Sequence, residues 1–244
     1  MSRIFITGST DGLGKALAEE LLWEGHDVVL HARNMQRAKA INYLKRSGAS
    51  IIAGDLSIDS QVRSIAESIN NTAPFDVVVH NAGVGSGSDI LNVNVLAPFM
   101  LSALIERPAR IIFLSSSMHY EGHPPGNQED LDSYITGCSY SDSKFLVTAL
   151  ALTLSRLWHD TTVNAVDPGW VPTKMGGRTA PDDFGRGYET QKWLAVSTEA
   201  EALTSGGYWH YKKRYQPHEL CSDTRFQSLL IEHLEKMTGI QLKK

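Results

Sequence analysis

The sequence is poor in cysteine and has no long apolar run. Its 244 residues include two cysteines, Cys138 and Cys221, far apart in the chain. A small disulfide-stabilised fold needs more of them, so we expect a reduced, intracellular protein. Cys138 lies two residues before Tyr140, but a small buried residue is a simpler interpretation of it than a nucleophile.

Basic residues are slightly fewer than acidic ones, and they form no basic cluster in the sequence. The 23 Lys and Arg residues against 27 Asp and Glu give a net charge of −4, which leaves nucleic-acid binding without an electrostatic basis. The apolar runs are too short for a membrane span. The opening MSRIFITGST has neither the apolar core nor the cleavage pattern of a targeting segment. We therefore expect a cytoplasmic protein without nucleic-acid partners.

Short apolar runs alternate with helical patterns through the first two-thirds of the chain. The runs are nearly continuous Val, Ile and Phe, which suits a parallel sheet covered by helices on both faces. No repeat or composition break divides the chain. We predict one α/β domain over 1–244, a doubly wound, mostly parallel sheet flanked by helices. Expected strands are 3–7, 27–31, 50–54, 75–80, 109–114, 161–166 and a final one at 206–211; expected helices are 13–25, 34–46, 58–70, 93–106, one starting near 139, and 226–239.

A glycine-rich loop follows the first expected strand. The stretch TGSTDGLG contains Gly8, Gly12 and Gly14. Glycine permits a tight turn and a close approach of the backbone to a phosphate, and the N–H groups opening the next helix face the anion. An ordinary βα turn is the alternative. The place of this loop between a strand and an amphipathic helix favours nucleotide binding.

Tyr140 and Lys144 lie four residues apart at the start of an apolar helical pattern. Both side chains therefore leave the same face of the helix. A phenol has a reference pKa of about 10, and a neighbouring cation lowers that pKa. Tyr140 could then exchange a proton with a carbonyl or an alcohol. An exposed surface pair is the alternative, and the glycine loop favours the catalytic interpretation.

Five motifs together resemble the short-chain dehydrogenase/reductase family. The stretches FLSSSMH and DPGWVPTKMGG are most similar to its retinol-dehydrogenase-like branch. The resemblance implies a Rossmann-type fold and an NAD(P)-dependent oxidoreductase that interconverts a carbonyl and an alcohol. The motifs, in the order of the family, are T-G-x3-G-x-G at 7–14, N-A-G at 81–83, the serines Ser115 and Ser116, Y-x-x-x-K at 140–144 and P-G at 168–169.

The resemblance also assigns a catalytic group of Asn94, Ser116, Tyr140 and Lys144. Ser116 would hydrogen-bond the substrate oxygen. We prefer it to its serine neighbours because it is the second serine of S-S-x-x-H, and because neighbours on an extended strand point the opposite way. Asn94 would hold a water that links Lys144 to solvent, although Asn92 competes for this role.

Cofactor contacts follow from the same resemblance. Thr173 would bond the carboxamide or the phosphates, and Lys144 the nicotinamide ribose. Asp55 would lie beside the adenine, or cap a helix. The implied cofactor-binding residues are Gly8, Ser9, Thr10, Gly12, Leu13, Gly14, Arg33, Asp55, Leu56, Asn81, Ala82, Gly83, Tyr140, Lys144, Pro168, Gly169, Val171 and Thr173.

The end of the second strand bears on the choice between NADP and NAD. An acidic residue there would bond the ribose 2′-hydroxyl, but VVLHARN contains none. Arg33 could instead hold a 2′-phosphate, or be a solvated surface arginine. Asp11 argues the other way, because many NADP-preferring members of the family carry a basic residue at this position. We expect NADP as the preferred cofactor, with NAD as the alternative.

The chain departs from the family pattern around the fourth helix. Only ten residues separate Gly83 from Asn94, so this helix is expected to be short. The resemblance implies a dimer interface on the fourth and fifth helices, and a shortened helix would reduce its apolar area. We therefore expect a monomer or an altered homodimer.

Two long segments are expected to form the walls of a substrate cleft. One is 118–136, where His119 and His123 have a spacing that could bind metal on a helix. Gly122 argues against a helix there and no third ligand is evident, so no metal is expected. The other is 174–196, part of a lid region of about 170–200. Its aromatic residues favour a mobile lid over an apolar carbonyl or alcohol substrate, or simply anchor a loop to the core.

One further function has to be weighed against an enzyme. A catalytically silent dinucleotide-binding sensor or interaction protein would keep the glycine loop but would not need Ser116, Tyr140 and Lys144 together. Steroid, retinoid, sugar and xenobiotic carbonyls all fit the predicted enzyme, because fold and catalytic group are shared across many substrates.

Overall fold

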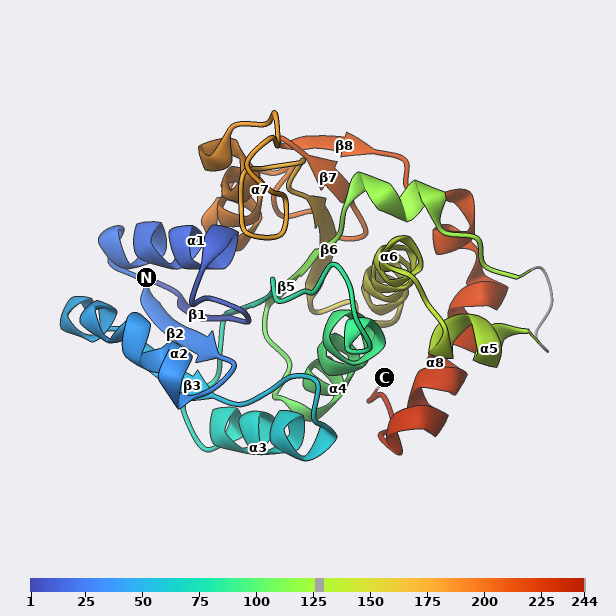
Figure 1. The fold of residues 1–244 in the computed structure, drawn as a ribbon, viewed down its shortest axis with the longest axis horizontal. Helices are drawn as coiled ribbons and strands as arrows, with labels where there is room; N and C mark the ends of the chain where they lie inside the picture. Colours follow the sequence, from blue (N-terminus) through green and yellow to red (C-terminus); the bar gives the residue numbers. More distant parts are fainter. Residues whose placement is uncertain (126–129, 244) are drawn as a thin grey trace.

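A single eight-stranded sheet organises the chain, in a computed structural model that describes residues 1–125 and 130–243 (Figure 1). The strand order is β3-β2-β1-β4-β5-β6-β7-β8. Neighbours pair in parallel up to β7, and β8 alone runs antiparallel. The order reverses at β1, between β2 and β4, where such sheets bind ligands. The strands are β1 (Arg3–Ile6), β2 (Asp27–Ala32), β3 (Ser50–Ala53), β4 (Val77–His80), β5 (Arg110–Leu114), β6 (Thr162–Asp167), β7 (Tyr208–His210) and β8 (Lys213–Tyr215).

Helices cover both faces of the sheet, so each face has its own apolar core. The helices α1 and α7 pack on one face, while α3, α4 and α6 pack on the other (Figure 1). The predicted α/β class and parallel sheet are confirmed. The α-helices are α1 (Gly12–Trp23), α2 (Met35–Ala40), α3 (Asp59–Asn70), α4 (Ala97–Leu104), α5 (Leu131–Thr136), α6 (Tyr140–Leu157), α7 (Phe184–Val196) and α8 (Thr224–Thr238); shorter helical segments are η1 (Asn42–Ser47), η2 (Asn92–Leu96), η3 (Ser117–Glu121) and η4 (Glu219–Ser222).

Several expected elements differ from those observed. The helix expected at 34–46 is split into α2 and the 3₁₀ segment η1, and the one expected at 93–106 starts with the π-helical turn η2. The strand expected at 206–211 is not the last, because the exposed edge strand β8 follows it. The connection expected at 118–136 contains η3 and α5; its residues 126–129 lie outside the described residues.

The chain's own C-terminal part covers the outer side of α6. Every residue from Ser143 to Leu154 is buried, which fits a helix covered on all sides. The sheet lies on one side of α6, and η4 and α8 pack against the other (Figure 1). The tail after α8 is tied down as well, because the Lys243 carbonyl accepts hydrogen bonds from Trp158 Nε1 at 2.8 Å and Arg107 at 3.0 Å.

Candidate active site

A cavity of about 870 Å³ opens at the carboxyl ends of the central strands. It brings together the glycine loop, the N-A-G segment, the serines after β5, the start of α6 and the segment after β6. Ser9, Gly14 and Asn94 do not line it. The predicted residues that do are Gly8, Thr10, Gly12, Leu13, Arg33, Asp55, Leu56, Asn81, Ala82, Gly83, Ser116, Tyr140, Lys144, Pro168, Gly169, Val171 and Thr173.

The glycine loop is held close to the segment after β4. Gly8 has φ +64°, and a Cβ there would lie 2.8 Å from Ala82 Cα, so only glycine fits. Asn81 Nδ2 donates to the carbonyls of Thr7 at 3.0 Å and Gly8 at 3.2 Å. Gly14 packs against the Asn81 side chain. This packing leaves the start of α1 facing the cavity.

His31 joins the glycine loop to the third strand, and the sequence argument overlooked it. Its Nδ1 accepts from Gly8 N at 3.1 Å, so its Nε2 must carry the proton that bonds Gly54 O at 2.8 Å. Burial lowers the pKa of His31, which favours this neutral form. Ser9 contributes from behind the loop, where its buried hydroxyl donates to Ile6 O and accepts from His31 N.

Tyr140 is the first residue of α6 and Lys144 lies one turn further along, as their spacing predicts. The helix start is fixed by a capping box between Ser139 and Asp142. Lys144 Nζ lies 5.5 Å from the centroid of the Tyr140 ring and donates to Leu114 O at 2.7 Å. Both side chains therefore reach the wall where β5 ends.

Two of the serines after β5, Ser115 and Ser116, are now distinguishable. Ser115 also lines the cavity, but its buried hydroxyl is engaged in a 2.6 Å hydrogen bond with Thr148 Oγ1. Ser116 Oγ accepts from Met118 N at 3.2 Å, and the Ser116 side chain lies near enough to Tyr140 to lower the pKa of the phenol in part. Of these two serines, Ser116 is the one whose hydroxyl lies with Tyr140.

The pKa of Tyr140 differs from the sequence expectation. Burial raises it, and the Ser116 hydrogen bond offsets only part of that effect. The same burial lowers the pKa of Lys144 to about 8. The predicted lowering of the phenol pKa is thus wrong for the protein alone, because the spacing revealed the neighbouring charge and not the loss of solvent around both groups.

Asn94 is buried in η2 beside the same group. Its amide exchanges hydrogen bonds with the backbone of Val84 at 2.8 and 2.9 Å and donates to Ser143 Oγ at 3.0 Å. A Cβ on Gly83 would lie 3.4 Å from Asn94 Oδ1 and 3.6 Å from Lys144 Nζ. Asn92, the competing residue, instead bonds Ser57 O. Asn94 is therefore the asparagine that neighbours Lys144.

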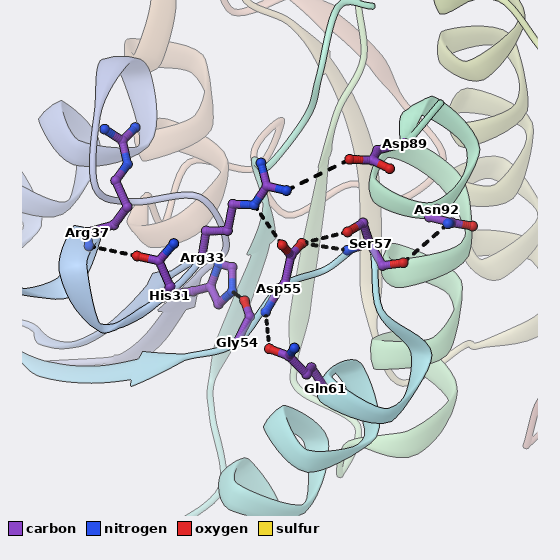
Figure 2. A network of polar contacts seen from close by, with 10 residues as sticks. His31, Arg33, Arg37, Gly54, Asp55, Ser57, Gln61, Asp89 and Asn92 are labelled. Carbon is purple, nitrogen blue, oxygen red and sulfur yellow. Dashed lines mark hydrogen bonds and ion pairs between the residues drawn. The ribbon is translucent and has the colours of Figure 1, made fainter. Parts of the chain in front are cut away.

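Arg33 stands at the other end of the cavity between two carboxylates (Figure 2). Its Nε donates to Asp55 Oδ2 at 2.7 Å, and its Nη2 lies 3.8 Å from Asp89 Oδ2. Asp55 also accepts from the Ser57 N–H and hydroxyl, while α3 has Ile58 at its N-cap. Asp55 therefore orients Arg33 and closes a turn, and it does not cap the helix.

Asp11 lies at the mouth of the cavity and is neutralised by cations from both walls. It caps α1 by accepting from Gly12 N at 2.9 Å. Lys174, in the segment after β6, bonds it, and Arg37 of α2 lies 3.7 Å away. Both cations also line the cavity. Lys174 opens the segment 174–196 that was expected to form a wall, whereas Arg37 was not predicted.

The remaining wall is largely apolar. Met118, Trp170 and Met175 line it and are each partly exposed. Part of the segment 174–196, expected to be mobile, is instead fixed in the core, because α7 packs against α1 and buries Trp193. Both ring nitrogens of His119 are engaged with protein partners. Among residues 1–125 and 130–243, no three His, Cys, Asp or Glu side chains form a metal-binding group.

Comparisons with known proteins identify relatives of the whole chain. A family model described as short chain dehydrogenase matches residues 2–183. The short-chain dehydrogenase chry4 of Gibberella zeae is 36% identical over 260 residues, covering 99% of each chain. Retinol dehydrogenase 13 of Homo sapiens is 30% identical over 210 residues, covering 72% of this chain and 61% of that protein. The expected likeness to retinol-dehydrogenase-like proteins is confirmed.

The fold is also found among solved structures. A Shigella flexneri protein assigned to the short-chain dehydrogenases and solved with NADP has a TM-score of 0.68 and 21% identity; the match covers 86% of this chain and 97% of that chain. In the described part of this chain, no helix has the length and apolarity to cross a bilayer.

Proposed function

The chain belongs to the short-chain dehydrogenase family and is an NAD(P)-dependent oxidoreductase, and we propose that Tyr140, Ser116, Lys144 and Asn94 form its catalytic group. One observation carries this proposal: Ser116, Tyr140 and Lys144 meet on one wall of the cavity that the glycine loop also lines. Such a wall can hold a small substrate against a dinucleotide.

Tyr140 supplies the proton in carbonyl reduction. The bound nicotinamide provides or accepts the hydride, and this chain's residues position and polarise the substrate oxygen. The raised pKa of the phenol keeps Tyr140 protonated at neutral pH, the form a proton donor needs. In alcohol oxidation the same group accepts the proton. Ser116, whose side chain lies near the phenol, offers a second hydrogen bond to the oxygen that gains charge.

Lys144 and Asn94 support this proton transfer. The positive charge of the Lys144 ammonium stabilises the phenolate that forms when Tyr140 gives up its proton. It is also placed to bond the ribose of the nicotinamide. The Asn94 amide fixes η2 to the backbone of Val84, close to Lys144 Nζ, and can hold a water leading to solvent.

NADP is the proposed cofactor. The residues of the cavity fit a dinucleotide, because a Cβ at Gly8 would collide with Ala82 and the start of α1 faces the opening. Arg33 and Arg37 follow β2 in the chain, and both line the cavity. The carboxyl end of β2 has no acidic residue that could accept a hydrogen bond from a ribose 2′-hydroxyl. The negative charge of Asp11 is already balanced by Lys174 and Arg37.

The substrate is proposed to be an apolar carbonyl or alcohol held under a short lid. Met118, Trp170 and Met175 supply the substrate side of the cavity with apolar surface. The lid would be the part of the region of about 170–200 that precedes α7. Its contact with the glycine loop is the pair Lys174 and Asp11, both exposed, which can open at little cost.

We also infer that the protein is a monomer. The outer side of α6 is covered by η4 and α8, and α4 is buried from Ala97 to Ala103 and packs against α3. Neither helix has an apolar face left for a second copy, so a dimer through these helices would need α8 to move.

A panel of carbonyl compounds tests the proposed function. Oxidation of NADPH and of NADH is followed for aromatic ketones, aliphatic ketones and sugar aldehydes, and the alcohol product is identified. The account expects turnover of at least one apolar ketone with NADPH, lost in Tyr140→Phe. A silent dinucleotide-binding protein would bind NADPH and leave every compound unchanged, with or without Tyr140.

A further inference from the structure

His119 is a buried histidine next to the proposed catalytic serine, and the proposed mechanism does not use it. It is 0% exposed and lies in η3, three residues after Ser116. Its ring is enclosed by aromatic neighbours, with centroids 3.9 Å from Tyr120 and 4.4 Å from Tyr208. A ring held in this way has little freedom to turn.

The hydrogen bonds of the ring define its tautomer. His119 Nε2 lies 3.1 Å from the backbone nitrogen of His218, and a backbone N–H can only donate. Nε2 must therefore be the unprotonated acceptor. Nδ1 then carries the ring proton and donates it to Ser116 O at 2.8 Å. Burial lowers the pKa of His119, in keeping with a neutral ring.

The carbonyl of Ser116 is thereby held twice. It accepts from the His119 backbone N–H at 3.0 Å and from the ring at 2.8 Å. The carbonyl and the side chain of a residue share one Cα, so fixing the carbonyl limits where the Ser116 hydroxyl can point. The ring also connects the end of β5 to the segment before η4, which is separated from it by about a hundred residues of sequence.

We propose that His119, through its Nδ1 proton, is a positioning residue that aims the Ser116 hydroxyl at Tyr140 and the substrate oxygen. The inference rests on the proposed function of Ser116 and Tyr140. It assigns His119 no contact with substrate or cofactor. Its effect belongs to the chemical step, because a mispointed serine weakens the hydrogen bond that forms as the oxygen gains charge.

Two isosteric substitutions separate positioning from packing. An asparagine amide nitrogen reaches the place of Nδ1, so His119→Asn can keep the bond to Ser116 O while losing the one to His218. A glutamine amide oxygen reaches the place of Nε2, so His119→Gln can keep the contact with His218 and lose the one to Ser116. The two variants therefore remove opposite ends of the same connection.

Turnover and stability are measured for both variants and the parent, with NADPH dissociation constants from fluorescence. We expect kcat of His119→Gln to fall about tenfold or more, because one hydrogen bond to a charged group in the transition state is weakened. KM and cofactor affinity should stay near those of the parent. We expect His119→Asn to keep kcat within about threefold although its melting temperature falls.

Equal kcat values in His119→Gln and the parent would overturn the inference, as would losses in both variants that follow melting temperature alone. A two-bond ¹H–¹⁵N spectrum of the histidines gives a readout without turnover. It should show a neutral Nδ1–H ring for His119 at neutral pH, and an Nε2–H ring would overturn the inference as well. Failure of the proposed function has a different signature: Ser116→Ala and Tyr140→Phe would then retain the activity of the parent.

Discussion

Lys144 Nζ lies 5.5 Å from the ring centroid of Tyr140, and both side chains are largely withdrawn from solvent. Their burial moves the two pKa values apart, raising that of the phenol above its ordinary value and lowering that of the ammonium from 10.5 to about 8. Tyr140 thus stays protonated, as a proton donor must be, beside a cation whose pKa approaches working pH. The predictions below test this pair and the cavity around it.

Replacing Lys144 by methionine should stabilise the fold at pH 7. The pKa of Lys144 falls from 10.5 to about 8 on folding, so between these values the unfolded chain binds more protons than the folded one. The free energy of unfolding of the parent therefore rises with pH across this window, and below pH 8 the full cost of burying the ammonium is present, about 3 kcal/mol.

The Lys144→Met variant loses both that cost and that pH dependence, along with turnover. Urea unfolding at pH 7 and pH 10 provides the measurement, and the difference between variant and parent is the quantity of interest. The advantage of the variant should shrink at pH 10. A variant that is less stable than the parent by the same amount at both pH values would show that Lys144 is not buried as a charge.

Arg33→Leu should shift cofactor preference toward NADH. A hydrogen bond to a charged group contributes about 1.5 to 3 kcal/mol, so the ratio of kcat/KM for NADPH to that for NADH should fall about 10- to 100-fold. Arg46→Leu, an exposed arginine that does not line the cavity, is the matched control. Asp89→Asn should have the opposite effect, because it frees Arg33 from one carboxylate. An unchanged ratio in Arg33→Leu would count against a 2′-phosphate contact.

Lys174→Ala should speed the release of NADPH. Lys174 bonds Asp11 across the mouth of the cavity, and an exposed pair contributes less than about 1 kcal/mol, so the rate should rise about two- to fivefold. Stopped-flow fluorescence follows the release through Trp170, which lines the cavity, with Trp170→Phe identifying its share of the signal. A release rate equal to that of the parent would mean that this contact does not hold the lid.

Sedimentation velocity should give the mass of one chain at micromolar concentration. A second variant changes Leu242, which is buried in the core cluster that includes residues of α6 and α8. Leu242→Asp should destabilise the tail by about 2 to 5 kcal/mol and promote association, because it uncovers apolar surface. A tight dimer of the parent through α4 and α6 would contradict the monomer.

Much of the sheet could be predicted because its strands are buried on both faces. Unbroken runs such as VVVH of β4 need no partner to be recognised. The strand β8 could not be, since its residues KRY are exposed and charged and gain their pairing only from β7. The helix α7 was hidden by Gly185 and Gly187; a Cβ at Gly187 would lie 2.8 Å from Val171, so glycine is there for close packing.

Some residues of the site could be predicted from local sequence spacing, and others could not. Tyr140 and Lys144 are one helical turn apart, so sequence spacing alone places them together. His31, Arg37 and Asp89 come from separate elements, and no local pattern connects them to the cavity. His119 belongs to the same S-S-x-x-H motif as Ser116, but its bond to the distant His218 has no sequence signal. The pKa of Tyr140 depends on burial by the whole fold, which explains why the spacing predicted the wrong direction for the protein alone.

Single-turnover reduction of a carbonyl substrate by Tyr140→Phe, with saturating NADPH, tests the central claim most directly. The account predicts a rate constant for the chemical step about 10²- to 10⁴-fold below that of the parent, with NADPH affinity unchanged and Tyr43→Phe, remote from the cavity, behaving as the parent. A Tyr140→Phe enzyme that reduces substrate as fast as the parent would contradict it.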